Sequence, residues 1–193
     1  VEPADGDCSL YLDHIRNNIC SADDELYDYI IHWMADAIQN PSSRPGVALA
    51  IRGQQGVGKG VFVNMFAKLF GPHFIQVTQS NHLVGNFNGH QKDKLLVFAD
   101  EAFWAGNKQA EGVLKGLVTE DTLSIEMKGV DVGQFPNFIR LILATNNDWV
   151  VPASAEQRRF VVIDASAARI QDTAYFGAII HQMENGGLEA LMY

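Results

Sequence analysis

The stretch GQQGVGKG, residues 53–60, decides how the surrounding chain folds. From Gly53 to Lys59 it fits the pattern GxxxxGK[ST] of a phosphate-binding loop, although Gly60 stands where that pattern has a hydroxyl for magnesium. An almost wholly apolar run, residues 47–51, precedes the loop, and a second apolar run follows it. A strand, a glycine-rich turn and the start of a helix are therefore expected in that order.

This loop is a candidate nucleotide site. Glycines let backbone N–H groups converge on phosphate oxygens, the helix N-terminus adds the positive end of its dipole, and Lys59 can reach the outer phosphates. A tight structural turn is the alternative, and the missing hydroxyl at Gly60 keeps that alternative open. The candidate nucleotide-binding residues are Gly53, Gln54, Gln55, Gly56, Val57, Gly58, Lys59, Gly60 and Val61.

Short apolar runs recur along the chain, each bounded by polar or turn residues. Runs without polar alternation are typical of a sheet that is covered on both faces. Helical segments between them, notably 60–70 and about 107–118, predict an α/β fold with a mainly parallel five-stranded sheet between helices. The runs are 47–51, 74–77, 95–98, 141–144 and 160–163.

Helical patterns flank this alternation on both sides. Apolar residues at helical spacing predict a helix over 24–40, with Trp33 in the core and Ser21 with Asp24 as a capping box. A second stripe, from Tyr175 to Met183, predicts a helix that packs on the core or as a lid. We expect one compact domain with a lead-in (1–45), an ATPase core (46–165) and a C-terminal helical segment (166–193).

Composition limits the class of protein. The 193 residues are 47% apolar and 19% charged, which is ordinary for a globular domain. No apolar stretch approaches the roughly 18 residues that cross a bilayer, so we expect no membrane contact. Cys8, Cys20 and six histidines show no metal-ligand spacing, which predicts a reduced, cytoplasmic environment and no metal other than nucleotide-bound magnesium. A net charge of −9 argues against duplex DNA on a broad outer face.

Polar side chains end two of the apolar runs. LLVFAD delivers Asp100 and then Glu101 to an edge where open α/β sheets bind ligands, so Asp100 can hold magnesium and Glu101 can orient or deprotonate a water. LILATNN brings Asn146, whose amide can contact the γ-phosphate or that water, although Asn is also common in turns. EQRRF places Arg158 and Arg159 before the last run; an arginine finger and a surface ion pair are both open.

Residues 122–138 break the pattern. Alternating Leu123, Ile125 and Met127, followed by Gly129 and Gly133, predict a β-hairpin that projects from the sheet. Phe135 is expected to pack the hairpin, with stacking on a nucleobase as the alternative.

In this order, GQQGVGKG, VFADE, a lysine-bearing hairpin, LILATNN and RRF resemble helicase superfamily 3, a branch of the AAA+ ATPases. Primase-helicases of poxviruses and of phages or mobile elements look most similar, and their loop often reads GKG or GKS. The resemblance covers about residues 25–165. It implies an AAA+-like P-loop NTPase with a β-hairpin inserted before the sensor strand.

The resemblance implies a ring helicase, usually a hexamer, with ATP and Mg²⁺ at subunit boundaries and single-stranded DNA in a central channel. Because a ring repeats each lysine, an acidic subunit can still line a basic channel. The matching positions are Lys59 for the phosphate-binding lysine, Asp100 and Glu101 for the acidic pair, Asn146 for the sensor, Arg159 with Arg158 in reserve for the trans finger, Lys128 beside Gly129 for the DNA contact, Lys115 as a lesser DNA contact, and Arg44 for a contact to the neighbour's nucleotide.

Beside these motifs, the missing hydroxyl at Gly60 is interpreted as a change in the magnesium shell, because Mg²⁺ readily keeps several waters. The chain begins at Val1 and is expected to be a piece of a phage or mobile-element replication protein; the resemblance implies that a primase-polymerase is often joined to this module in the same polypeptide. We expect the isolated piece to be monomeric or weakly associating. Two alternatives are an AAA+ ATPase that remodels or loads a protein, and a nucleotide-binding assembly module with little hydrolysis.

Overall fold

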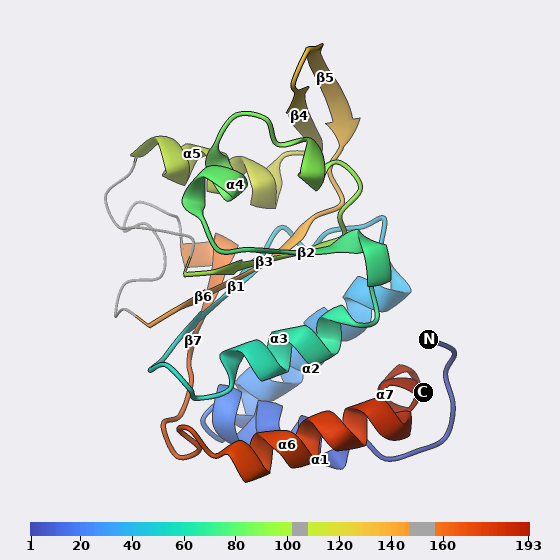
Figure 1. The fold of residues 1–193 in the computed structure, drawn as a ribbon. Coiled ribbons are helices and arrows are strands. Elements are labelled where there is room, and N and C mark those ends of the chain that lie inside the picture. The colour runs from blue at the N-terminus through green and yellow to red at the C-terminus, as the bar shows by residue number, and fades with distance from the viewer. Residues whose placement is uncertain (102–107, 147–156) are drawn as a thin grey trace.

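A five-stranded parallel sheet forms the centre of the molecule, with the order β2-β3-β6-β1-β7. The structure is a computed structural model that describes residues 1–101, 108–146 and 157–193. Helices cover both faces of the sheet (Figure 1), so the expected α/β fold is confirmed. The strands are β1 (Ala48–Arg52), β2 (Phe74–Val77), β3 (Leu96–Asp100), β6 (Arg140–Thr145) and β7 (Phe160–Asp164).

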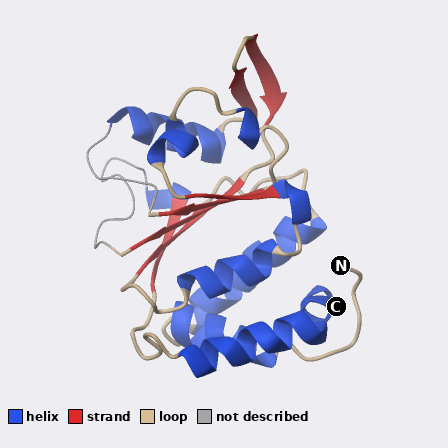
Figure 2. Cartoon of the chain, viewed as in Figure 1, coloured by secondary structure: helices blue, strands red, loops and turns tan. Residues whose placement is uncertain are grey.

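The apolar runs are strands because both of their faces are buried. Along β1, Leu49 and Ile51 join the core on one face, whereas the smaller Ala48 and Ala50 join the core on the other. The first face is covered by α1 (Ser9–His14), α2 (Asp24–Gln39), α3 (Lys59–Ala67), α6 (Thr173–Gln182) and α7 (Leu188–Met192); the second by α4 (Ser80–Val84) and α5 (Lys108–Thr119), as the blue helices of Figure 2 show.

The expected hairpin stands on the second face and points away from the sheet (Figure 1). It consists of β4 (Thr122–Met127) and β5 (Val130–Pro136), paired antiparallel and joined through Lys128 and Gly129. Gly129 has a φ of 76°, which glycine adopts without strain. Phe135 is half-buried against the second core and lies 4.3 Å from the Lys92 ammonium, so it packs the base of the hairpin as expected.

The N-terminus of α2 is capped differently from the predicted capping box. The N-cap is Asp23, whose side chain accepts from the backbone N–H of Leu26 at 3.0 Å. Ser21 lies outside the helix with a φ of 52°, and its hydroxyl donates to the carbonyl of Asp164. The capping-box prediction was wrong because a contact to a distant strand takes the hydroxyl. Trp33 is in the core as expected, and its Nε1 donates to the carbonyl of Val47 at 3.2 Å.

Short helical turns complete the described chain. They are the π-helical η1 (Ile15–Ile19), then η2 (Gly71–His73), η3 (Gly89–Gln91), η4 (Gln157–Arg159) and η5 (Met183–Gly187). The two ends of the chain meet where the N–H of Ala4 donates to the carbonyl of Glu189. Within the described residues, no helix has the length and apolar character needed to cross a membrane.

Candidate active site

The glycine-rich loop connects β1 to α3, as its sequence predicts. Gly56 and Gly58 have φ values of 85° and 93°, a region that other residues enter only with strain. A Cβ on Gly58 would also lie 2.4 Å from Cε1 of Phe176, so only glycine fits there. Helix α3 begins at Lys59, directly after Gly58, and so directs its N-terminus at the loop.

Lys59 lies across the loop with its ammonium at the centre of the site. Its Nζ donates to the carbonyls of Gly53 at 2.5 Å and Gln54 at 3.0 Å, and to Oδ1 of Asn146 at 2.9 Å. Partial burial lowers the pKa of Lys59, while the nearby carboxylates of Asp100 and Glu101 oppose that shift. The lysine is thus held in the one direction that faces the acidic pair.

The acidic pair reaches this point because β3 lies beside β6 in parallel register, with Asp100 opposite Ala144. Burial raises the pKa of Asp100 and the Glu101 charge raises it further, against Lys59 and a hydrogen bond from Gln76. That hydrogen bond runs from Gln76 Nε2 to Asp100 Oδ2 at 3.1 Å. The site therefore concentrates negative charge that a cation would relieve.

Asn146 joins the two halves of the site. Its amide oxygen accepts from Lys59, and its amide nitrogen donates to Oε1 of Glu101. Glu101 has a φ of 54°, an uncommon conformation that places its side chain just beyond the strand. The amide thus lies between the phosphate-loop lysine and the carboxylate that the sequence marks as a candidate base.

These residues line one open cavity of about 350 Å³. Its wall includes three residues that the sequence analysis did not select, Gln171, Thr173 and Phe176, at the start of α6. The helical stripe of this segment indicated packing, and no local signal reveals which loop it packs on. The remaining lining residues are Gln55, Gly56, Gly58, Lys59, Gly60, Val61, Asp100, Glu101 and Asn146.

Gly60 is unlike the other glycines of the loop. A Cβ there would meet only Nδ2 of Asn64, at an ordinary 3.8 Å. A serine therefore fits without moving the backbone, and the absence of a hydroxyl is not a steric requirement of the fold.

Arg158 and Arg159 lie at the amino ends of the parallel strands, whereas the cavity lies at the carboxyl ends. They form η4 immediately before β7, and Phe160 pairs with Ala48 at the start of β1, whereas the loop follows the end of β1. The first and last of the five residues of β1 are four steps apart, so at about 3.3 Å per residue the two ends of the strand are separated by roughly 13 Å. The two arginines are therefore remote from the cavity of their own chain.

Arg44 has a structural role in the same chain. Its guanidinium donates to the carbonyls of Val118 at 3.0 Å and Glu120 at 2.8 Å, and it pairs with Asp121 at 3.3 Å. Its side chain is only 10% exposed. This geometry ties the end of α5 to the lead-in and does not support the expected contact to a neighbour's nucleotide.

The candidate DNA contacts are separated in space. Lys128 and Gly129 are exposed at the tip of the hairpin. Lys115 lies within α5 and is half-buried, away from that tip. Phe87, which the sequence analysis did not select, is 57% exposed at a φ of 58° on the loop that borders the hairpin. Its neighbour Asn88 fixes this loop by donating to the carbonyl of Ser124 and accepting from the N–H of Glu126.

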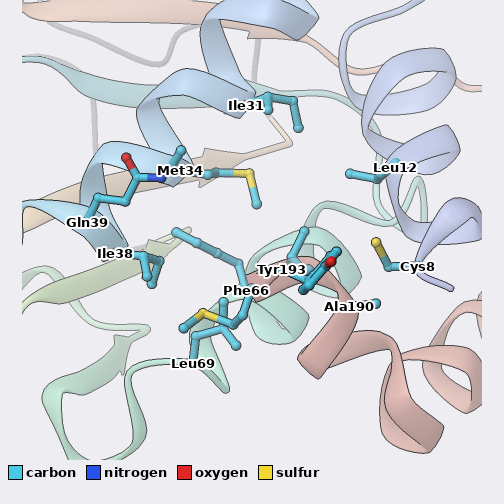
Figure 3. A pocket seen from close by; sticks show the side chains of 13 residues that line it. Cys8, Leu12, Ile31, Met34, Ile38, Gln39, Phe66, Leu69, Ala190 and Tyr193 are labelled. Atoms are coloured by element: carbon cyan, nitrogen blue, oxygen red, sulfur yellow. The ribbon is translucent and has the colours of Figure 1, made fainter. Parts of the chain in front are cut away.

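A second cavity, of about 290 Å³, lies on the first face between α1, α2, α3 and α7 (Figure 3). Its lining is mostly apolar, with Met34, Phe66 and Leu69 among the side chains that surround it. It holds none of the loop, acidic or sensor residues, so it is no part of the nucleotide site. Among the described residues, no cluster of three or more His, Cys, Asp or Glu side chains could hold a metal ion.

The fold, with a glycine-rich loop after β1 and an acidic pair at the end of β3, is of the superfamily 3 helicase type. The chain itself belongs to DUF5906, a family of unknown function whose model matches residues 51–159. It is 31% identical over 152 residues to the "DNA Primase-polymerase" of Nitratiruptor phage NrS-1, which covers 73% of this chain and 21% of the phage protein. The chain thus spans about a fifth of that relative.

Solved structures support the same assignment of the fold. The apo structure of the NrS-1 C-terminal region superposes with a TM-score of 0.83 at 25% identity, covering 100% of this chain and 47% of that chain. The structure of JCV helicase with a bound acetamide compound gives a TM-score of 0.52 at 15% identity over 98% of this chain and 53% of that one, a likeness in fold alone. The sequence-based recognition of superfamily 3 is confirmed.

Proposed function

We propose that this chain is the ATP-hydrolysing module of a DNA helicase that translocates on single-stranded DNA during replication of a phage or mobile element. One observation carries the proposal: Lys59, Asn146 and Glu101 are joined by hydrogen bonds across a cavity that Asp100 and the glycine-rich loop also line. The names of the relatives, a phage primase-polymerase and a viral helicase, agree with that assignment.

The residues present fit ATP with Mg²⁺. The loop and the start of α3 offer backbone N–H groups and a positive dipole end to phosphates, and Lys59 adds a charge. Asp100 would hold the metal, because its carboxylate ends β3 in the wall of the same cavity, where burial and then the Glu101 charge raise its pKa and a cation would oppose that shift. The metal would supply charge neutralisation on the phosphate oxygens. Glu101 orients and deprotonates water, and Asn146 positions Glu101.

The arginines on the far edge suggest how subunits combine. Because Arg158 and Arg159 lie across the sheet from their own cavity, we infer that they serve the cavity of a second subunit. We infer a homo-oligomer, a hexamer in the complete protein, and weak association of this chain alone. Arg159 is the proposed trans finger and Arg158 the reserve.

The hairpin supplies the proposed DNA contact. Lys128 presents a charge at its exposed tip, and Phe87 presents an aromatic face on the loop that is hydrogen-bonded to β4. A lysine for the backbone and an aromatic ring for a base are the usual elements of single-strand binding. A ring would repeat both around the channel, which accommodates a net charge of −9 per chain.

Steady-state ATP turnover with and without single-stranded DNA, over a range of protein concentrations, tests this function. We expect DNA to stimulate turnover and the rate per chain to rise with concentration. Lys128→Ala should weaken single-strand binding several-fold, whereas Lys68→Ala, which removes an exposed charge paired with Glu184, should not. An ATP turnover rate that changes neither on addition of DNA nor in Lys128→Ala would contradict the helicase assignment.

One observation favours a second function, remodelling or loading of a protein partner. Val130 and Val132 on the hairpin are 57% and 60% exposed, and apolar side chains at such a position suit a protein contact. Replacing both with threonine separates the two functions. DNA stimulation that is unchanged after Val130→Thr with Val132→Thr supports a protein contact for these valines, whereas loss of the stimulation with intact folding assigns them to DNA binding and argues against the protein contact.

A further inference from the structure

We propose that His14 and Asn18 of the N-terminal lead-in are positioning residues that orient the backbone of the phosphate-binding loop. Neither residue touches the cavity, and neither belongs to the loop, the acidic pair or the sensor strand. The inference rests on the proposed nucleotide site and adds the residues that hold it open.

Both side chains are buried polar groups that contact the loop from the lead-in. His14 is 0% exposed and Asn18 is 2% exposed. Nε2 of His14 lies 3.2 Å from the carbonyl oxygen of Gly58, and Nδ2 of Asn18 donates to the carbonyl of Val57 at 2.6 Å. The π-helical turn η1, which follows His14, contains Asn18 and brings the two side chains to the same loop. Such wide turns occur often at functional sites.

The geometry of the peptide unit turns these two contacts into a statement about phosphate binding. Every peptide bond described here is trans, so each carbonyl points opposite to the N–H of the following residue. The carbonyl of Gly56 accepts from the N–H of Gln171 at 2.9 Å, that of Val57 accepts from Asn18, and that of Gly58 accepts from His14 and from the N–H of Phe62 in α3 at 3.1 Å. Asn18 and His14 hold their two carbonyls from the buried lead-in, and Gln171 holds the first from the segment before α6, so the N–H groups of Val57, Gly58 and Lys59 are directed away from these donors.

The protonation of His14 follows from its partners. A carbonyl can only accept, so Nε2 carries the hydrogen that it donates to Gly58, and Nδ1 then accepts from the hydroxyl of Tyr175 at 3.3 Å. Burial lowers the pKa of His14, which keeps this neutral form. The Gly58 carbonyl thereby fixes the tautomer, and the Tyr175 hydroxyl connects α6 to the loop through the imidazole.

Asn18 buries an unpaired polar atom, which destabilises the fold, and its contact with the loop explains why a polar side chain is present. Its Oδ1 is buried without a hydrogen-bond partner among the described residues. An apolar side chain of similar size would avoid that unpaired acceptor. Donation from Nδ2 to Val57 is the interaction that an apolar side chain could not replace.

The test compares ATP with AMP, because AMP lacks the outer phosphates that the loop holds. Affinities are measured in Mg²⁺ for the whole chain and for His14→Leu, His14→Gln and Asn18→Leu, each with urea unfolding. We expect His14→Leu and Asn18→Leu to weaken ATP binding about tenfold and to change AMP binding little. His14→Gln, whose amide can donate to Gly58, should restore most of the ATP affinity.

Tyr11→Phe is the matched control. It removes another buried hydrogen bond from the same lead-in, but that bond goes from the Tyr11 hydroxyl to the carbonyl of Phe62 within α3, at 2.7 Å. Its ATP affinity should stay unchanged, so a loss equal to that of His14→Leu would reduce the role of His14 to general stability. If His14→Leu does not fold, Tyr175→Phe, on a half-buried helix, takes its place as the test. Tyr175→Phe should also weaken ATP binding.

The outcomes separate this inference from the function on which it rests. If the unmodified, folded chain binds no ATP, the proposed function and the inference both fail. If it binds ATP and the His14, Asn18 and Tyr175 variants bind ATP equally well, the nucleotide site stands and the positioning role is overturned.

Discussion

At the scale of single residues, the loop separates positions that only glycine can occupy from one that is open. Gly58 has a left-handed backbone and no room for a Cβ, whereas Gly60 has an ordinary helical backbone and free space beside it. The departure from the sequence pattern thus falls at the one glycine of the loop where a side chain would be tolerated. The interpretation of Gly60 as a change in magnesium coordination stays a prediction.

Gly60→Ser and Lys59→Ala are expected to act in opposite directions. Gly60→Ser should keep or tighten Mg²⁺-dependent ATP binding, because the added hydroxyl can replace one metal-bound water without a clash. Lys59→Ala should abolish hydrolysis, because it removes the charge between the loop and Asn146. Titration with ATP at several Mg²⁺ concentrations, together with phosphate release, measures both effects. Turnover at the unmodified rate in Lys59→Ala would show that the loop is not a nucleotide site.

Several site residues could be predicted from the sequence because they follow strands in a parallel sheet. Lys59, Asp100, Glu101 and Asn146 lie at the carboxyl ends of β1, β3 and β6, and parallel strands bring those ends to one edge. His14 and Phe176 were missed because their contacts join segments far apart in the chain. No local periodicity records which loop such a side chain will meet.

At the scale of elements, the strands and the hairpin were predictable to within a residue or two, whereas the entry to α2 was not. Apolar runs identify strands that are buried on both faces, whatever their neighbours are. The cap of α2 depended on competition between Ser21 and Asp23 for the helix start. The carbonyl of Asp164, which takes the Ser21 hydroxyl, is fixed only by the tertiary fold.

Helix α5 provides a prediction at this scale. Arg44→Ala should lower the free energy of unfolding by about 1–3 kcal/mol, because the carbonyl of Val118 loses its side-chain donor and that of Glu120 keeps only the donor from Asn137. The exposed pairing with Asp121 should add little. Urea unfolding measures the loss, and Arg16→Ala, which breaks the exposed pair with Asp24, should cost less than about 1 kcal/mol. Equal, small effects of the two variants would argue that Arg44 does not hold α5.

At the scale of the whole molecule, the cavity lies at the carboxyl ends of the parallel strands and the arginine pair lies at their amino ends. In the proposed oligomer, each subunit would therefore carry one complete cavity and one donor group for the cavity of another subunit. The expected consequence is an enzyme whose activity belongs to pairs of chains.

Mixing two inactive variants tests that consequence. Lys59→Ala lacks a working cavity but keeps its arginines, whereas Arg159→Ala keeps the cavity and lacks the proposed finger. Mixed assemblies contain boundaries with both functional halves, so part of the ATPase activity should return on mixing. The measurement is phosphate release against mixing ratio at constant total protein. Activity that never exceeds the sum of the separate variants, under conditions where they co-assemble, would place the finger elsewhere.

The position of β7 also bears on where this family's folding unit ends. The family model matches residues 51–159, yet β7 begins at Phe160 and pairs with every residue of β1, most of which lies before residue 51. A polypeptide trimmed to the matched span would lose both strands and leave the wholly buried β6 as a bare edge. Exposed apolar edges recruit strands from other chains, so such a piece should aggregate. The unit of sequence similarity is narrower than the unit that folds.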